Sequence, residues 1–95
     1  MISFEWDDEK NLNNKAKHGV SFEEATTVFY DEDALLEYDA EHSNGEDRFR
    51  LLGYSSKSNL LIVVHCVRKE DVIRIISSRH ATRQERINYE RSLDI

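Results

Sequence analysis

Three strand-like segments follow one another in the second half of the chain, and only short polar connections separate them. They read RFRLLGY at residues 48–54, LLIVVHCV at residues 60–67 and VIRIISS at residues 72–78. Parallel neighbours would need a crossover of a dozen or more residues, whereas a tight turn joins antiparallel strands. The sequence therefore predicts an antiparallel meander. SFEW at residues 3–6 and ALLEY at residues 34–38 are typical of two further short strands.

A first helix is expected over residues 8–18. Leu12 and Ala16 lie at helical spacing and predict a narrow apolar stripe, which Val20 extends. Gly19 is a natural stop for this helix, because glycine adopts the left-handed conformation that often ends a helix.

Two capping boxes predict two more helices. Residues 21–24 read S-x-x-E and residues 82–85 read T-x-x-E, the pattern in which side chains at a helix N-terminus satisfy free amide groups. We therefore predict a single α+β domain over residues 1–95. Two N-terminal helices pack on one face of a mainly antiparallel β-sheet, a C-terminal helix follows, and the other sheet face is open to solvent or to a ligand.

The composition fits one globular domain. The chain has 95 residues, of which 39% are hydrophobic and 34% charged. Its longest apolar run, LLIVV, is too short to span a membrane, and the acidic first ten residues lack the apolar core of a signal peptide. A single cysteine cannot form an internal disulfide, so we expect a reducing, cytoplasmic setting and no membrane contact.

Charge is distributed unevenly along the chain. The net charge is −6, but residues 1–47 hold 14 acidic and 3 basic residues, giving −11, whereas residues 48–95 hold 5 acidic and 10 basic residues, giving +5. The second half can therefore present a basic face to phosphates, or both halves can be solvated surface.

An arginine among isoleucines is the clearest sign of a functional face, because burying an unpaired charge is costly. Strand alternation divides the last segment into two faces, Arg74, Ile76 and Ser78 on one and Ile73, Ile75 and Ser77 on the other. The second set begins with more apolar residues, so we expect helices to cover it and Arg74 to lie on the open face.

Further arginines are expected near Arg74. Arg48 and Arg50 join it on the open face if Phe49 and Leu51 belong to the core. Arg79 lies at the end of the last segment. Guanidinium groups bind phosphate oxygens in a bidentate manner, which favours a phosphate site. In the alternative interpretation, each arginine pairs with a nearby carboxylate, for which the candidates are Glu46, Asp47 and Glu70.

The histidines and the single cysteine do not indicate a metal site. His65 ends the apolar run LIVVH and is typical of a partly buried structural histidine, and His18 abuts a helix terminus, where a cation is favoured. His42 and His80 lie in polar segments and are expected to be exposed. No pair has the spacing of zinc ligands, Cys66 stands alone, and there is no phosphate-binding glycine loop or nucleotide fingerprint. We expect neither a metal nor a cofactor.

Metal-free cleavage of RNA is a reaction that such residues can support. Attack by the 2′-hydroxyl of the RNA itself needs no enzyme nucleophile. It needs a proton acceptor, a proton donor, and cations that stabilise charge on the phosphate. Arginines and one carboxylate or histidine would suffice.

Five motifs occur together along the chain. They are FEWD at residues 4–7, KHGVSFEEA at residues 17–25, HSxGExR at residues 42–48, Gly53, and RIISxRxATxxER at residues 74–86. Together, from residue 4 to about Tyr89, they resemble the BrnT family of type II toxins. Ser78 departs from the family pattern, which usually has a small apolar residue there.

The resemblance implies a RelE-like fold and a toxin that cleaves RNA without a metal. It also implies a BrnA-type antitoxin that carries a DNA-binding domain, so that operator DNA is contacted only through the antitoxin, and a complex of two toxins with two antitoxins is one expected assembly. The alternative is a non-catalytic antitoxin-binding module that acts only in operon autoregulation.

The resemblance also suggests site residues. Arg48, Arg74 and Arg79 would bind phosphate and stabilise its developing charge, with Glu46 as a candidate base and His65 as a candidate acid or base. Lys17 matches the family motif as well, and either contributes to the site or caps its helix.

Overall fold

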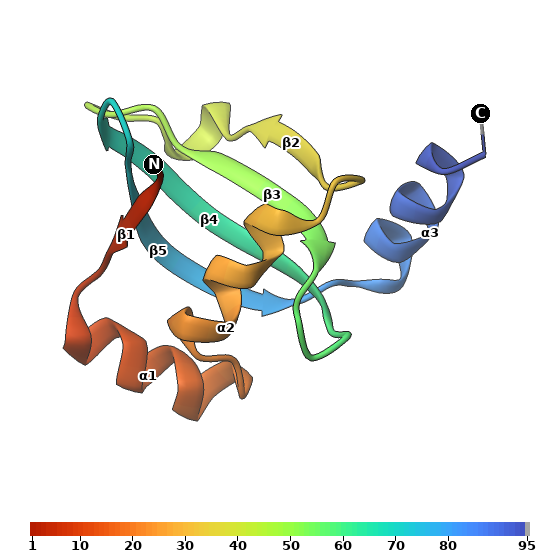
Figure 1. Cartoon of the computed structure of the whole chain (residues 1–95), viewed down its shortest axis with the longest axis horizontal. Helices are drawn as coiled ribbons and strands as arrows, with labels where there is room; N and C mark the ends of the chain where they lie inside the picture. Colours follow the sequence, from red (N-terminus) through yellow and green to blue (C-terminus); the bar gives the residue numbers. More distant parts are fainter. Residues whose placement is uncertain (95) are drawn as a thin grey trace.

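A five-stranded sheet forms the centre of the structure, a computed structural model that describes residues 1–94 (Figure 1). The strands lie in the order β1-β5-β4-β3-β2. Strands β2 to β5 form the antiparallel meander that the sequence predicts, and β1 pairs in parallel with the outer edge of β5. Their bounds are β1 Ser3–Glu5, β2 Leu35–Tyr38, β3 Phe49–Tyr54, β4 Leu60–Lys69 and β5 Val72–His80.

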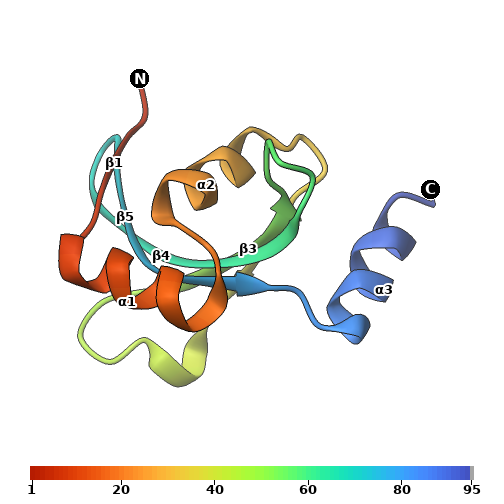
Figure 2. The same ribbon diagram turned by 90° about the horizontal axis from the view of Figure 1, so that it is seen from below.

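Within the described residues, three α-helices and two 3₁₀ turns accompany this sheet. Figure 2 shows α2 on one side of the sheet and the yellow-green segment that contains η2 on the other, with α3 beyond the end of β5. None of the described helices is both long and apolar enough to cross a membrane. The bounds are α1 Asp8–His18, α2 Phe22–Thr27, η1 Val28–Tyr30, η2 Ala40–His42 and α3 Arg83–Ser92.

The main core lies between the sheet and the α2–η1 segment. Its apolar side chains alternate along the strands, as expected for a sheet with one covered face. They are the buried residues Val20, Phe22, Ala25, Val28, Leu51, Leu61, Val63 and Ile75. Tyr89 of α3 packs on a smaller cluster of Leu52, Leu60 and Ile62, and its hydroxyl donates a 2.6 Å hydrogen bond to Asp31.

The predicted apolar stripe was wrong for the two residues within α1, whereas Val20 is buried in the core. Leu12 is 70% exposed and Ala16 is exposed, whereas Asn14 is buried. The reason lies in β5, which continues beyond β1 and leaves backbone groups without a strand partner at Ser78. The Asn14 side chain accepts from the Ser78 amide at 3.1 Å and donates to the Ser78 carbonyl at 2.8 Å. Buried backbone groups need hydrogen-bond partners, so α1 buries the Asn14 side chain against β5 instead of Leu12 or Ala16.

The helix-end signals were largely correct. Gly19 ends α1 in the left-handed conformation with φ of 72°, and Thr82 and Glu85 form both hydrogen bonds of a capping box at α3. At α2 only half of the predicted box forms: Ser21 accepts from the Glu24 amide. The Glu24 carboxylate instead accepts from the side chains of the β3–β4 turn, Ser55 at 2.6 Å and Asn59 at 2.8 Å.

Candidate active site

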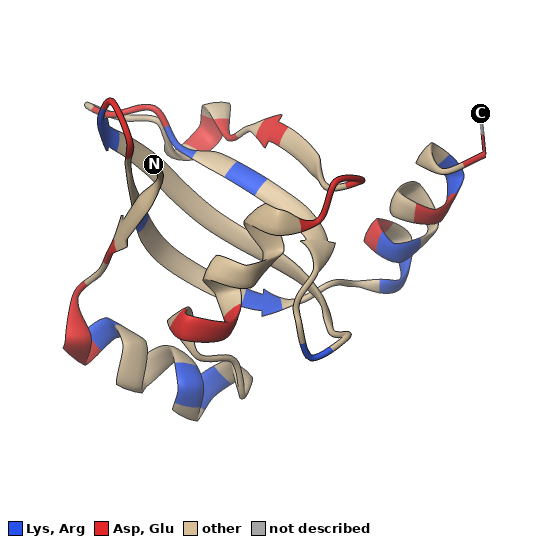
Figure 3. Cartoon of the chain, in the orientation of Figure 1, with Lys and Arg blue, Asp and Glu red and all other residues tan. Residues whose placement is uncertain are grey.

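A cavity of about 350 Å³ lies on the open face of the sheet, between the strands, the η2 segment and the end of α1. Figure 3 shows basic bands within β3 and at the end of β5, with acidic segments around them. Three arginines and two histidines in one cavity suit an anionic ligand. The lining residues are His18, Asp39, His42, Arg48, Arg50, Ile62, Val64, Ile76, Ser77, Ser78 and Arg79.

A β-bulge in β5 brings Arg79 to this cavity. Val64 pairs with Ser77 and His65 pairs with Ile75, so Ile76 is an extra residue on the β5 side. In a regular strand Arg74 and Arg79 would lie on opposite faces, because their separation is odd. The extra residue reverses the alternation, as bulges do, and both arginines lie on the open face.

The same bulge overturns the predicted position of Ser78. Sequence alternation placed Ser78 on the face of Arg74, but it pairs with Val63 of the covered core and is 1% exposed. Its hydroxyl donates a 3.0 Å hydrogen bond to the Ile62 carbonyl, so the polar group is satisfied there. This bond explains how a serine is accommodated in a buried position.

Two of the cavity arginines are held by carboxylates. Arg79 forms a bidentate pair with Glu85 of α3, at 2.8 and 3.0 Å. Arg50 pairs with Glu37 of the neighbouring strand and lies 3.6 Å from Asp39. Bidentate and paired arginines have little freedom to reorient, so these two guanidinium groups form fixed walls of the cavity.

Arg48 is different. Within residues 1–94 its side chain has no ion-pair partner, and its Nε atom is buried without a hydrogen bond. Its backbone is well held, because its amide donates to Ser43 at 3.0 Å and its carbonyl accepts from the Asp39 amide at 2.8 Å. A buried donor without a partner costs about 1–3 kcal/mol. Arg48 also lines the cavity, so its guanidinium group is available to an anion there.

His42 and Asp39 form a hydrogen-bonded pair at the cavity. The Nδ1 atom of His42 lies 3.1 and 3.0 Å from the two carboxylate oxygens of Asp39. Asp39 is only 4% exposed. Burial alone would raise the pKa of Asp39, but the hydrogen bond and charge of His42 and the charge of Arg50 lower it overall. The carboxylate is therefore ionised, and His42 donates its Nδ1 proton to it.

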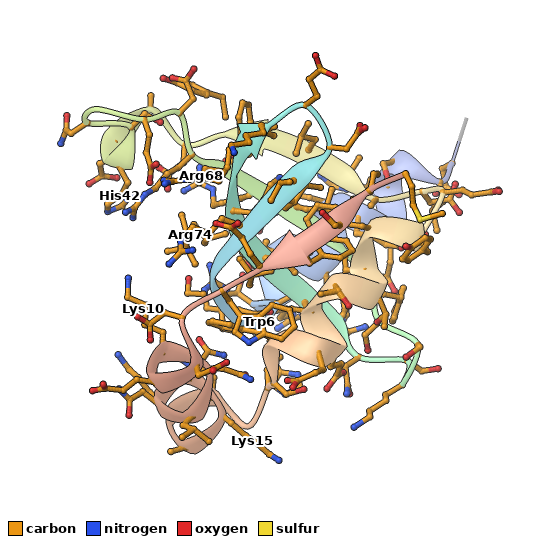
Figure 4. All side chains as sticks on the ribbon, turned by 60° about the vertical axis from the view of Figure 1, so that its left-hand side comes forward. Trp6, Lys10, Lys15, His42, Arg68 and Arg74 are labelled. Atoms are coloured by element: carbon orange, nitrogen blue, oxygen red, sulfur yellow. The ribbon has the colours of Figure 1, made fainter. Side chains whose placement is uncertain are left out.

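Three of the predicted site residues lie on the open face or beside it, but outside the cavity. Arg74 pairs with Glu5 at 2.9 Å, and Glu46 pairs with Arg68 at 3.1 Å. Figure 4 shows Arg68, Arg74 and His42 on the same side of the molecule. Lys17 lines a neighbouring hollow that shares His18, Ile76 and Ser77 with the cavity. The alternative of carboxylate pairing thus holds for Arg50, Arg74 and Arg79, although their partners are not the ones expected.

His65 lies on the other face of the sheet. It is 4% exposed, its ring contacts those of Phe29 and Phe49, and its Nδ1 atom lies 3.1 Å from the Val63 carbonyl. Burial lowers the pKa of His65, and the Val63 contact only partly opposes this. The structural interpretation of His65 fits this environment, and the structure does not bring it together with the arginines.

Comparison with known proteins identifies the family. A sequence model described as "Ribonuclease toxin, BrnT, of type II toxin-antitoxin system" matches residues 6–85. The chain belongs to the BrnT family. BrnT proteins are ribonuclease toxins of type II toxin–antitoxin systems, so this enzyme is an endoribonuclease whose partner is a protein antitoxin.

A solved structure supports the fold of this BrnT toxin. The crystal structure of the Brucella abortus ribonuclease toxin BrnT is similar with a TM-score of 0.68 and 20% sequence identity, over 87% of this chain and 100% of that one. No curated protein sequence gives a significant match.

The sequence interpretation missed three cavity residues: His18, Asp39 and His42. His42 belongs to the HSxGExR motif, and Asp39 precedes it by three residues, the separation at which a 3₁₀ turn brings side chains together. The presence of His42 in the same motif as Arg48 was therefore the sequence feature that could have indicated a role for His42 in the site. Within residues 1–94 no three His, Cys, Asp or Glu side chains are grouped closely enough to hold a metal ion.

Proposed function

We propose that this BrnT toxin cleaves RNA at the arginine-lined cavity without a metal, by attack of a ribose 2′-hydroxyl on the adjacent phosphate. The observation that carries the proposal is the unpaired Arg48 guanidinium, whose buried Nε has no partner within residues 1–94. Fixed donors that face developing negative charge are an effective means of stabilising a phosphoryl transition state. Arg50 and Arg79, already held by carboxylates, supply further positive charge around the same phosphate.

The residues beside the cavity have a different role in this proposal. Neither Arg74 nor Lys17 lines the cavity, and they would contact the phosphates that flank the cleaved bond. Glu46 is engaged by Arg68 at 3.1 Å, so we assign it to holding that arginine rather than to proton transfer. Phosphate contacts of this kind position an RNA strand and give no base specificity.

The proposed setting follows from the family. The antitoxin is of the BrnA type, it carries the DNA contacts of the complex, and two toxins assemble with two antitoxins in the cytoplasm. The order of two helices, a sheet and a final helix supports assignment of the fold to the RelE-like group.

The test is cleavage of a single-stranded RNA oligonucleotide by the purified protein, with EDTA and with added magnesium. We expect equal rates, and fragments that end in a 2′,3′-cyclic phosphate and a 5′-hydroxyl. The cognate antitoxin should suppress cleavage and raise the melting temperature, since binding only the folded state stabilises it by about 2.7 kcal/mol at 100 times Kd. Loss of cleavage in EDTA would refute the metal-free mechanism.

A different outcome would favour the non-catalytic alternative. The pairing of Arg50, Arg74 and Arg79 with carboxylates is the observation in its favour, because it reduces the positive charge available to RNA. Antitoxin binding without any RNA cleavage, and without growth inhibition on expression, would establish that alternative.

A further inference from the structure

The two histidines of the cavity come from different elements and differ in their surroundings. His42 lies at the end of η2 and its Nδ1 atom is engaged by Asp39. His18 is the last residue of α1 and is half-buried at the cavity wall. Both therefore line the same cavity as Arg48, Arg50 and Arg79. We propose that His42, oriented by Asp39, is the general base of RNA cleavage and that His18 is the general acid. This inference rests on the proposed function.

The hydrogen bond to Asp39 suits His42 to accept a proton. In a neutral imidazole one nitrogen carries a proton and the other has a free electron pair. Asp39 is buried and acts as an acceptor, so the proton of neutral His42 is held on Nδ1 and the free electron pair lies on Nε2. The carboxylate also stabilises the imidazolium that forms once Nε2 has taken a proton.

The position of His18 suits it to donate a proton. The carbonyl groups at the C-terminal end of a helix carry partial negative charge and favour a cation there. Among the described residues, no carboxylate forms an ion pair with His18. The arginines of the cavity oppose a further positive charge, but a bound phosphate would offset them. The charged groups that line the cavity with the two histidines are Asp39, Arg48, Arg50 and Arg79, and Lys10 and Lys17 line the neighbouring hollow that includes His18.

The proposed step is balanced in protons and bonds. The 2′-hydroxyl gives its proton to His42 Nε2 while its oxygen forms a bond to phosphorus. The bond from phosphorus to the 5′-oxygen breaks, and the leaving 5′-oxygen takes a proton from His18. The products are a 2′,3′-cyclic phosphate and a 5′-hydroxyl, and solvent returns both histidines to their starting states. Arg48 stabilises the additional charge on the phosphate during this exchange.

The experiment uses two RNA oligonucleotides and three matched variants. The bond cleaved by the parent protein is mapped first, and a second oligonucleotide then carries sulfur in place of the 5′-oxygen at that bond. A thiolate leaves without needing a proton, so this substrate needs no general acid. The variants are His42→Asn, which retains a donor for Asp39, His18→Asn, and His80→Asn as a control at an exposed position outside the cavity.

On the ordinary oligonucleotide, we expect His42→Asn and His18→Asn to lower kcat by about 10²–10⁴-fold, the usual contribution of a general acid or base. On the sulfur-containing oligonucleotide, His18→Asn should recover to within about tenfold of the parent, whereas His42→Asn should not. A general base and a general acid that act together should give the parent a bell-shaped pH–rate profile. His42→Asn should lose its acidic limb and His18→Asn its alkaline limb.

The outcomes separate this inference from the proposed function. If the parent and His80→Asn cleave RNA and Arg48→Gln does not, the proposed function stands, and the histidine variants test the inference alone. A folded His42→Asn variant with parental kcat would overturn it, as would failure of the sulfur substitution to restore His18→Asn. A parent protein that does not cleave RNA would overturn both. Unchanged melting temperatures and antitoxin binding verify the fold of each variant.

Discussion

Replacing Arg48 should change activity and stability in opposite directions. Arg48→Met keeps an unbranched apolar stem and removes the guanidinium group. In the parent, the buried Nε donor has no partner among residues 1–94, and such a group destabilises a fold by about 1–3 kcal/mol. Its removal should offset the lost contacts of a half-buried side chain. We therefore expect the free energy of unfolding to stay equal or to rise by about 1 kcal/mol, which would raise the melting temperature by about 4–8 °C.

The activity of Arg48→Met should fall sharply. Loss of one fixed donor to a transition-state oxyanion costs on the order of 10²–10³ in kcat, or about 2.7–4 kcal/mol. Arg48→Lys should restore only part of the rate, because an ammonium lacks the planar fork of donors. Arg91→Met on α3 is the control, since Arg91 is exposed and lies outside the cavity lining.

Two measurements on the same preparations decide the matter. Thermal unfolding gives the change in stability, and single-turnover cleavage of the RNA oligonucleotide gives the rate of the chemical step. Arg50→Met provides a contrast, because it removes partners of Glu37 and the buried Asp39 and should lower both stability and rate. Destabilisation of Arg48→Met by more than about 1 kcal/mol, or RNA cleavage at the parental rate, would contradict this prediction.

Three further predictions concern the surroundings of the cavity. Arg74→Ala should lower the free energy of unfolding by roughly 0–1 kcal/mol. Because Arg74 lies outside the cavity, the variant should raise KM for RNA more than it lowers kcat. If steady-state kinetics show a change in kcat alone, Arg74 acts at the cleaved phosphate instead. The hydrogen bond from Arg79 lowers the pKa of Glu85 to about 2, although burial partly opposes this shift. The pair therefore adds to the free energy of unfolding above about pH 4.5, and this contribution is lost as the pH falls towards 2. After a discount for solvent screening we expect about 1–2 kcal/mol of such acid sensitivity, visible in urea unfolding at several pH values and missing in Glu85→Gln. Tyr89→Phe should lower the free energy of unfolding by about 1.5–3 kcal/mol, because it removes a 2.6 Å hydrogen bond to the Asp31 carboxylate; an unchanged urea midpoint would contradict this.

Much of the fold could be predicted from local signals. Short connections identified the meander, and Gly19 and the Thr82–Glu85 capping box marked helix ends that the structure confirms. Gly53 belongs to a family motif with no local explanation in the sequence. In the structure, a Cβ atom there would lie 3.0 Å from atoms of Val28, Asp31 and Ala34, so only glycine lets β3 approach the η1 segment this closely.

The composition of the site was harder to predict because it depends on register. A single extra residue at Ile76 moves every later residue of β5 to the other face, and strand alternation alone cannot reveal it. The partners of the arginines follow no fixed separation along the sequence. Arg74 pairs with Glu5, which is 69 residues away in the chain, whereas Arg79 pairs with Glu85 only six residues away.

The histidines show the same limit. The family resemblance suggested a chemical role for His65, whereas the apolar run that it ends predicted a buried structural role. The structure buries His65 on the other face of the sheet. His42 was expected to be merely exposed because its segment is polar. Its significance comes from Asp39, whose carboxylate is buried by the loop that carries them both. Polarity in sequence predicted exposure correctly, but it could not predict which exposed group a buried carboxylate would orient.

The acidic character of the chain and its basic cavity have one physical explanation. Carboxylates from the first half of the chain, Glu5, Glu37 and Asp39, hold arginines from the second half. Each ion pair weakens the long-range attraction between the arginine and RNA, but it also restricts the flexible arginine side chain to one orientation. Strong binding to phosphates would require free arginines and lysines in number, whereas transition-state stabilisation requires charges at fixed positions. Within residues 1–94 Arg48 is held by its backbone and has no ion-pair partner among these fixed groups, and in the proposed mechanism its partner is the phosphate.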